Sequence, residues 1–204
     1  MTKIVDENNL DLAAESLKNG GVVCFPTETV YGIGVVYDSE KAFNDLVKAK
    51  KRSPDKPFAL MSSTVDMATK FIDVNEKRAN LMKHFLPGEV TFLVKAREDL
   101  PKWVTLGTGV IGIRVPASDL VHDLIEKVGK PCLVTSANMS GEPTSVSFEE
   151  TRKTFDGIAD VIVDGKCNSL HASTIIDITK DDIKLIREGG LSFETVLDYW
   201  GNLK

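Results

Sequence analysis

The chain has 204 residues, of which 42% are hydrophobic and 27% are charged, and its formal net charge is −5. This acidic balance argues against a protein whose whole surface binds nucleic acid, while a local basic site is compatible with it. The sequence contains no run of about 18 apolar residues that would cross a membrane. Residues 1–10 lack the apolar segment of a signal peptide. We therefore expect a single domain over residues 1–204, located in the cytoplasm.

Hydrophobic periodicity predicts helices and strands that alternate early in the chain and strands that cluster late. The predicted helices cover 9–19, a segment from 40 capped by Asp38 and Ser39, 65–71, 76–85, a segment to 128 capped by Ser118, 148–155 and 192–200. The predicted strands cover 22–25, 58–61, 90–95, 110–115, 131–135, 160–164, 174–178 and 183–186, the last two antiparallel. This order predicts an α/β protein with a mixed sheet rather than a pure βαβ series.

The three cysteines, Cys24, Cys132 and Cys167, are widely spaced and form no CxxC pair. Such spacing supports neither a disulfide framework nor a zinc site. Because Cys24 and Cys132 lie inside apolar runs, we expect both in the core as small hydrophobic residues.

A polar motif, PTETVYGIG at 26–34, follows the apolar run 22–25. Open α/β sheets place ligands at the carboxyl ends of strands, where such a motif would form the rim of a pocket. Thr27, Thr29 and Tyr31 alternate, so in an extended backbone their hydroxyls share one direction. The two glycines of the motif permit a sharp turn or a close approach of the backbone. A turn without a ligand is the alternative interpretation.

A basic cluster at 48–56 has five basic residues among nine. A solvated helix end, where cations offset the helix dipole, would explain Lys48 and Lys50. It explains Arg52 and Lys56 less well, since they lie in or beyond a helix break at Ser53-Pro54-Asp55. A site for a polyphosphate is the second interpretation, and both stay open at this point.

Arg114 lies in the apolar strand 110–115, and a partly buried cation there needs an anion. A protein carboxylate could supply it, or the carboxylate or phosphate of a ligand. Two further polar segments, 136–141 and 187–190, follow predicted strands. If these segments meet, the resulting cavity holds several cations and many hydroxyl or amide donors. It would suit a phosphate-bearing ligand and act by positioning and charge stabilisation, because no nucleophile set or carboxylate pair accompanies it.

Seven segments, in this order, resemble the motifs of the YrdC family of L-threonylcarbamoyladenylate synthases. They are PTETVYGIG (26–34), KAKKRSPDKPF (48–58), PGEVTF (87–92), GIRVP (112–116), TSANMSG (135–141), STIID (173–177) and IREGG (186–190). The resemblance implies a twisted, mixed parallel and antiparallel sheet with helices around a deep basic cavity. It also implies a nucleotidyltransferase that makes threonylcarbamoyl-AMP and pyrophosphate from L-threonine, bicarbonate or CO2, and ATP. A partner complex would then modify N6 of adenosine 37 in tRNA.

The same resemblance implies roles for individual residues. Those implied to bind L-threonine are Thr27, Thr29, Tyr31, Arg114, Val134 and Ser173. Those implied to bind ATP are Lys50, Arg52, Lys56, Ser136, Asn138, Thr144 and Arg187, of which Lys50 and Arg52 are also implied to be catalytic. Mg2+ would be held mainly by the ATP phosphates, without a protein metal site.

The chain departs from the family pattern at a few positions. Lys56 stands where the family often has Asn, and Met61 stands where it often has His, so Met61 cannot donate a hydrogen bond to the substrate. The chain resembles the short form of the family, which has one domain. Two alternative functions remain at this level: a double-stranded RNA or tRNA binder without catalysis, and a carbamoyl-transfer paralogue with another acceptor.

Overall fold

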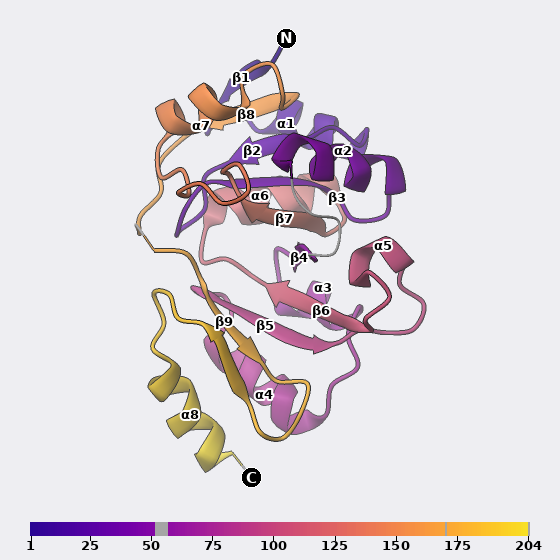
Figure 1. The fold of residues 1–204 in the computed structure, drawn as a ribbon, viewed down its shortest axis with the longest axis vertical. Coiled ribbons are helices and arrows are strands. Elements are labelled where there is room, and N and C mark those ends of the chain that lie inside the picture. The colour runs from indigo at the N-terminus through magenta and orange to yellow at the C-terminus, as the bar shows by residue number, and fades with distance from the viewer. Residues whose placement is uncertain (52–56, 170, 204) are drawn as a thin grey trace.

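The protein is described by a computed structural model that covers residues 1–51, 57–169 and 171–203. The strands in these ranges are β1 Lys3–Asp6, β2 Val23–Phe25, β3 Gly32–Val36, β4 Ala59–Met61, β5 Val90–Lys95, β6 Val110–Arg114, β7 Cys132–Ser136, β8 Val161–Asp164, β9 Thr174–Asp177 and β10 Lys184–Arg187. They form one sheet in the order β1-β8-β2-β3-β7-β4-β6-β5-β9-β10 (Figure 1).

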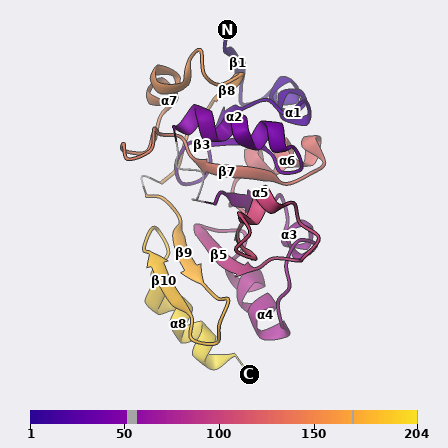
Figure 2. The same cartoon turned by 45° about the vertical axis from the view of Figure 1, so that its right-hand side comes forward.

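The sheet is mixed, as expected from the sequence. Parallel pairs join β1 to β8, β8 to β2, β4 to β6 and β5 to β9, and the other neighbours are antiparallel. The antiparallel pairing of β9 with β10 confirms the prediction for the last two strands. The chain termini lie at opposite ends of the long axis, and the sheet twists between them (Figures 1 and 2).

The helices are α1 Asp11–Lys18, α2 Glu40–Lys50, α3 Val65–Thr69, α4 Glu76–Phe85, α5 Lys102–Thr105, α6 Asp119–Val128, α7 Phe148–Phe155 and α8 Phe193–Asn202. Serine side chains begin three of them, because Ser39, Ser118 and Ser147 each accept a hydrogen bond from a backbone N–H in the first turn. Among the helices of the described ranges, none has the length and apolar character that a membrane crossing requires.

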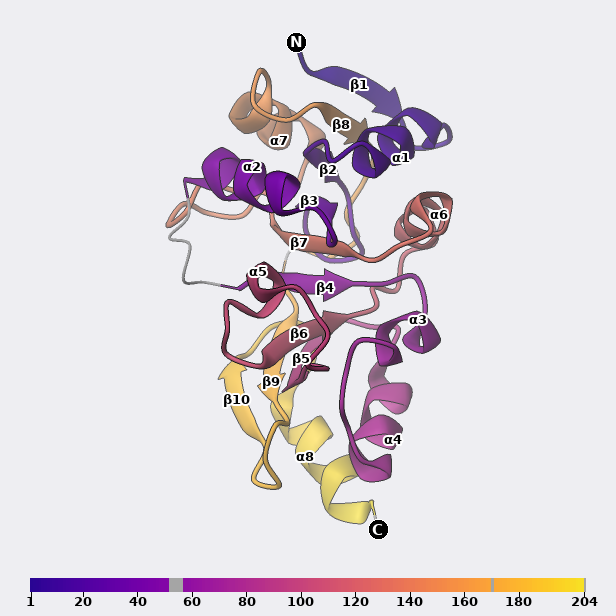
Figure 3. The ribbon, with the colours of Figure 1, turned by 90° about the vertical axis from the view of Figure 1, so that its right-hand side faces the viewer.

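Apolar side chains pack on both faces of the sheet. Val23 and Phe25 point into a core that includes residues of α1 and α6, whereas Cys24 belongs to the core that includes α2 and α7. Figure 3 shows α1 and α6 on one side of this part of the sheet, with α2 and α7 on the other. This alternation follows the two-residue period of a strand. Cys24 and Cys132 are both buried, as predicted.

Three elements were not predicted: β1, β3 and α5. The strand β1 is largely exposed and α5 is a single turn, so neither has strong apolar periodicity. The strand β3 contains both glycines of the 26–34 motif, which serve close packing rather than a sharp turn. A Cβ at Gly34 would lie 2.8 Å from Cγ2 of Val134 and 2.9 Å from the carbonyl oxygen of Leu133.

Candidate active site

A small cavity lies where the bend between β2 and β3 meets residues of β4, β5, β6, β7, β9 and β10. Its volume is about 190 Å3. The sequence-predicted residues that line it are Thr27, Tyr31, Arg114, Val134, Ser136, Ser173 and Arg187. These residues are up to 160 positions apart in the chain, and the central strands of the sheet bring them together.

Two guanidinium groups line this cavity, from Arg114 at the end of β6 and Arg187 at the end of β10. Burial lowers the pKa of Arg187, and the positive charge of Arg114 lowers it further. Arg187 donates through Nε and Nη2 to the carbonyl oxygen of Ser173, at 3.2 and 2.7 Å. It has no ion pair with a carboxylate among the described residues. An anion between the two groups would relieve their repulsion.

Arg114 is held by the bend between β2 and β3. Its Nη2 lies 3.0 Å from Glu28 Oε1, 2.5 Å from Thr29 Oγ1 and 3.4 Å from Thr27 Oγ1. Of the two sources of an anion left open by the sequence, the protein therefore supplies one, the carboxylate of Glu28. Glu28 lies inside the PTET motif, but its role as the partner of Arg114 was not predicted.

The hydroxyls of Thr27, Thr29 and Tyr31 do not share one direction, so this expectation was wrong. The backbone bends at 28–30 instead of running extended. Thr27 Oγ1 and Thr29 Oγ1 are hydrogen-bonded at 2.9 Å, while Tyr31 Oη donates to the carbonyl oxygen of Gly165 at 2.7 Å. Burial raises the pKa of Tyr31, so its phenol stays a neutral donor. Thr27 and Tyr31 still line the cavity.

Lys50 is buried and supports the loop after β7 rather than lining the cavity. Its Nζ donates to Ser136 O at 2.5 Å, to Asn138 Oδ1 at 3.0 Å and to Asn138 O. The amide of Asn138 in turn donates to Met139 O and Glu142 O. The polar groups of Lys50 and Asn138 thus hold this loop in place, and neither residue lines the cavity.

Four other predicted ATP-binding residues have different outcomes. Thr144 is half-buried and does not line the cavity. Arg52 and Lys56 lie outside the described residues. Ser136 does line the cavity, and its hydroxyl donates to Asn138 Oδ1 at 2.7 Å.

A buried hydroxyl pair lies in the cavity wall. Thr91 Oγ1 on β5 and Ser173 Oγ just before β9 are 3.0 Å apart, and both side chains are buried. Next to them the wall is apolar, with Met61 and Ile175. Sequence reasoning missed Thr91 as a site residue. The sequence feature that could have identified it is a polar side chain inside the apolar strand of the PGEVTF motif.

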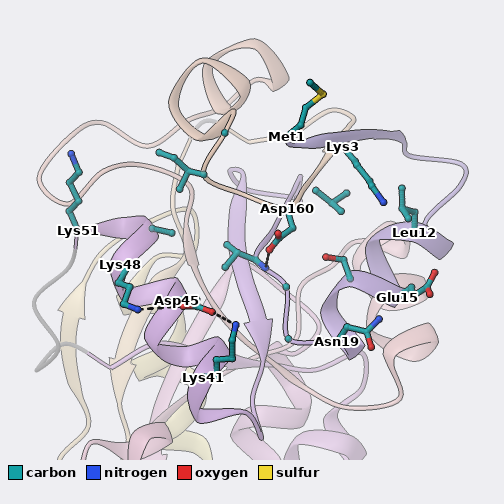
Figure 4. A pocket seen from close by; sticks show the side chains of 18 residues that line it. Met1, Lys3, Leu12, Glu15, Asn19, Lys41, Asp45, Lys48, Lys51 and Asp160 are labelled. Carbon is teal, nitrogen blue, oxygen red and sulfur yellow. Dashed lines mark hydrogen bonds and ion pairs between the residues drawn. The ribbon is translucent and has the colours of Figure 1, made fainter.

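A larger groove of about 920 Å3 lies at the N-terminal end of the sheet, beside α1 and α2 (Figure 4). It contains none of the predicted site residues. Two of its lysines share the carboxylate of Asp45, with Lys41 Nζ at 2.7 Å and Lys48 Nζ at 3.7 Å. Both lysines are largely exposed, whereas the smaller cavity is lined by the buried guanidinium of Arg114. We therefore assign the smaller cavity as the candidate active site.

The described residues offer no cluster of three or more His, Cys, Asp or Glu side chains for a metal ion. Glu28, the acidic residue at the Arg114 side of the cavity, is already ion-paired. The donor set therefore does not fit a metal cage built by the protein alone.

The fold and cavity together define a mixed α/β protein with a small cavity lined by the guanidinium groups of Arg114 and Arg187. The Sua5–YciO–YrdC family model, described as "Telomere recombination", matches residues 15–189. The chain therefore belongs to this family, which confirms the resemblance seen in the sequence motifs.

Curated relatives and a solved structure agree with this assignment. The threonylcarbamoyl-AMP synthase of Pyrococcus abyssi is 32% identical over 202 residues, covering 98% of this chain and 59% of the relative. The threonylcarbamoyl-AMP synthase of Bacillus subtilis is 34% identical over 187 residues, covering 90% of this chain and 54% of the relative. A crystal structure of P. abyssi Sua5 complexed with L-threonine superposes with a TM-score of 0.92 at 30% identity, covering 100% of this chain and 62% of the other. The chain thus spans just over half the length of these curated relatives.

Proposed function

We propose that this chain is an L-threonylcarbamoyladenylate synthase, acting as one YrdC-like domain over residues 1–204. The observation that carries the proposal is the meeting of Arg114 and Arg187 at one cavity of about 190 Å3. Names of relatives at 32% and 34% identity support the same activity.

The size of the cavity favours an amino acid as the ligand inside it. Pockets for drug-sized molecules measure about 300–1,000 Å3, and this cavity is smaller. The wall combines a guanidinium for a carboxylate, buried hydroxyls and the apolar side chains of Met61 and Ile175. L-threonine has the matching carboxylate, hydroxyl and methyl group. The similar P. abyssi protein was crystallised with that amino acid.

In the proposed reaction the amine of L-threonine takes up CO2 or bicarbonate and forms a carbamate. A carbamate oxygen then forms a bond to the α-phosphorus of ATP, while the bond from that phosphorus to the bridging oxygen of the β-phosphate breaks. Threonine, bicarbonate and ATP thus give threonylcarbamoyl-AMP, pyrophosphate and water. Arg114 orients the amino acid, and Arg187 stabilises negative charge as it develops. The chemistry requires no nucleophile from the protein.

ATP is larger than the cavity, so we place its phosphates at the cavity rim, near Ser136 and Arg187. Arg52 and Lys56 are assigned to the phosphates by their sequence motif alone. Mg2+ would accompany the ATP phosphates, since the described residues do not form a cage for it. The bound cation would offset charge on the triphosphate.

The product is a mixed anhydride of a carbamate and a phosphate, so an acceptor amine must consume it. We propose that a downstream tRNA threonylcarbamoyl-transferase complex passes the group to N6 of adenosine 37. Binding of tRNA or double-stranded RNA without catalysis is not favoured, because the relatives that match the chain are named as synthases.

The test is pyrophosphate release by the purified chain supplied with ATP, Mg2+ and bicarbonate. We expect release that requires L-threonine and a product that contains both threonine and AMP. Release that depends on another acceptor would instead support the carbamoyl-transfer alternative. No release in the presence of all substrates would refute the synthase assignment.

A further inference from the structure

We propose that Glu28 is a positioning residue, which holds the Arg114 guanidinium in the orientation that binds the amino acid. This inference rests on the proposed function and adds to it a residue that acts on the amino acid through Arg114. Glu28 is 5% exposed, and its Oε1 lies 3.0 Å from Arg114 Nη2. Glu28 itself does not line the cavity.

The backbone of Glu28 is held by hydrogen bonds from another loop. Its carbonyl oxygen accepts hydrogen bonds from the backbone N–H groups of Asn168, at 3.3 Å, and Ser169, at 2.9 Å. These two residues belong to the loop between β8 and β9. The loop therefore anchors the bend that presents Glu28.

The two threonines beside Glu28 act as acceptors for Arg114. The Thr27 hydroxyl donates to Val30 O at 2.7 Å, so in its 2.9 Å contact with Thr29 it is the acceptor and Thr29 is the donor. Thr29 is left to accept from Arg114 Nη2. Both hydroxyl hydrogens are thus used within the bend. The two residues orient the guanidinium and do not donate to a ligand.

The ion pair between Glu28 and Arg114 uses only one carboxylate oxygen and one guanidinium nitrogen. Within the described part of the chain, three buried side-chain polar atoms lack a hydrogen-bond partner, and two of these are Glu28 Oε2 and Arg114 Nε. A bidentate pair would use both atoms. The single contact fixes the Nη2 corner of the guanidinium and leaves donors of Arg114 for a ligand carboxylate.

Glu28→Gln is the sharpest test, because glutamine keeps the size and one acceptor oxygen but removes the charge. Hydrogen bonds to charged groups are about twice as strong as neutral ones, so we expect the KM for L-threonine to rise about tenfold. The KM for ATP should stay within about twofold, since Glu28 acts only through Arg114. The dissociation constant for L-threonine, measured by calorimetry, should rise with its KM. A purely structural role would not separate the two substrates in this way.

Asp181→Asn is the control. Asp181 forms an ion pair of 2.9 Å with Arg78, and neither residue lines the cavity. This variant should keep both KM values. If Glu28→Gln fails to fold, Thr29→Val removes the hydroxyl that accepts from Arg114 and should also raise the KM for L-threonine.

The outcomes separate the two proposals. If the wild type is active and the folded Glu28→Gln variant has an unchanged KM for L-threonine, the positioning role alone is overturned. The same holds for an unchanged KM in Thr29→Val if Glu28→Gln does not fold. An equal rise in both KM values overturns it as well. A wild type without threonine-dependent pyrophosphate release overturns the proposed function, and the positioning role falls with it.

Discussion

Replacing Lys50 by methionine distinguishes a loop-supporting lysine from one that acts on ATP. The Lys50 side chain is buried, with 2% of the residue exposed, and its ammonium donates to two carbonyl oxygens and one amide oxygen of residues 136 and 138. Methionine keeps the length of the chain but leaves these acceptors without their charged donor. Each hydrogen bond to a charged group contributes roughly 1.5–3 kcal/mol, and a buried acceptor left without its donor costs about 1–3 kcal/mol.

We therefore expect Lys50→Met to lower the free energy of unfolding by about 3–5 kcal/mol. For a chain of this size, that corresponds to a fall in Tm of roughly 6–20 °C. Urea unfolding followed by circular dichroism measures the first quantity, and a thermal scan measures the second. The loss is a large fraction of the roughly 5–15 kcal/mol that stabilises a typical protein.

Lys48→Met is the matched control on the same helix. The Lys48 side chain is 78% exposed, and its Nζ is 3.7 Å from Asp45. Exposed ion pairs contribute about 0–1 kcal/mol, so this variant should unfold nearly like the wild type. If Lys50→Met proved as stable as Lys48→Met and yet lost pyrophosphate release, the ammonium would act on the substrate. The reasoning from its hydrogen bonds would then be refuted.

Three further predictions concern the cavity, the sheet and the thiols. Arg187→Met should reduce threonine-dependent pyrophosphate release by about 100-fold or more. It should also lower the free energy of unfolding by about 1–3 kcal/mol, because the hydrogen bonds to Ser173 O are lost. Lys184→Met, on the same strand but outside the cavity, should stay active. Gly34→Ala should lower the free energy of unfolding by about 1–3 kcal/mol, because its Cβ would meet β7; an unchanged urea midpoint would contradict this packing. Burial raises the pKa of Cys132 to about 12 and that of Cys167 to about 11. A thiol reagent should therefore label the native protein slowly at pH 8, with half-buried Cys167 first and faster as the pH rises; rapid labelling of Cys132 would show that the core opens.

Secondary structure with strong periodicity was predicted well from the sequence. The bounds of α4, β5 and α7 agree with the predicted segments, because each of these elements has clear apolar periodicity or a capping residue. The strand β3 was missed since two of its five residues are glycines, which have low strand propensity. Its pairing with β2 and β7 overrides that preference, and Gly34 allows the close contact with Val134.

The candidate site was predicted in part. Arg114 and Arg187 were found as cations at strand ends, and the structure brings both to one cavity. Lys50 was assigned to ATP from the family motif, but neither the motif nor charge patterning reveals which way a side chain turns. Its ammonium reaches carbonyl oxygens 86 and 88 residues away. The role of Glu28 as the partner of Arg114 was not predicted because an acid within a polar motif resembles a solvated turn residue.

The sequence by itself determined the family, the mixed sheet and the residue types available for anion binding, since ordered motifs and apolar periodicity are local properties of the chain. Only the tertiary structure decided which of these polar groups face the cavity and which hold a loop or a bend. The physical reason is that hydrogen bonds such as Arg114 to Glu28 and Lys50 to Ser136 join strands and helices far apart in sequence. Whether such a donor remains available for a ligand depends on acceptors that only the folded sheet places beside it.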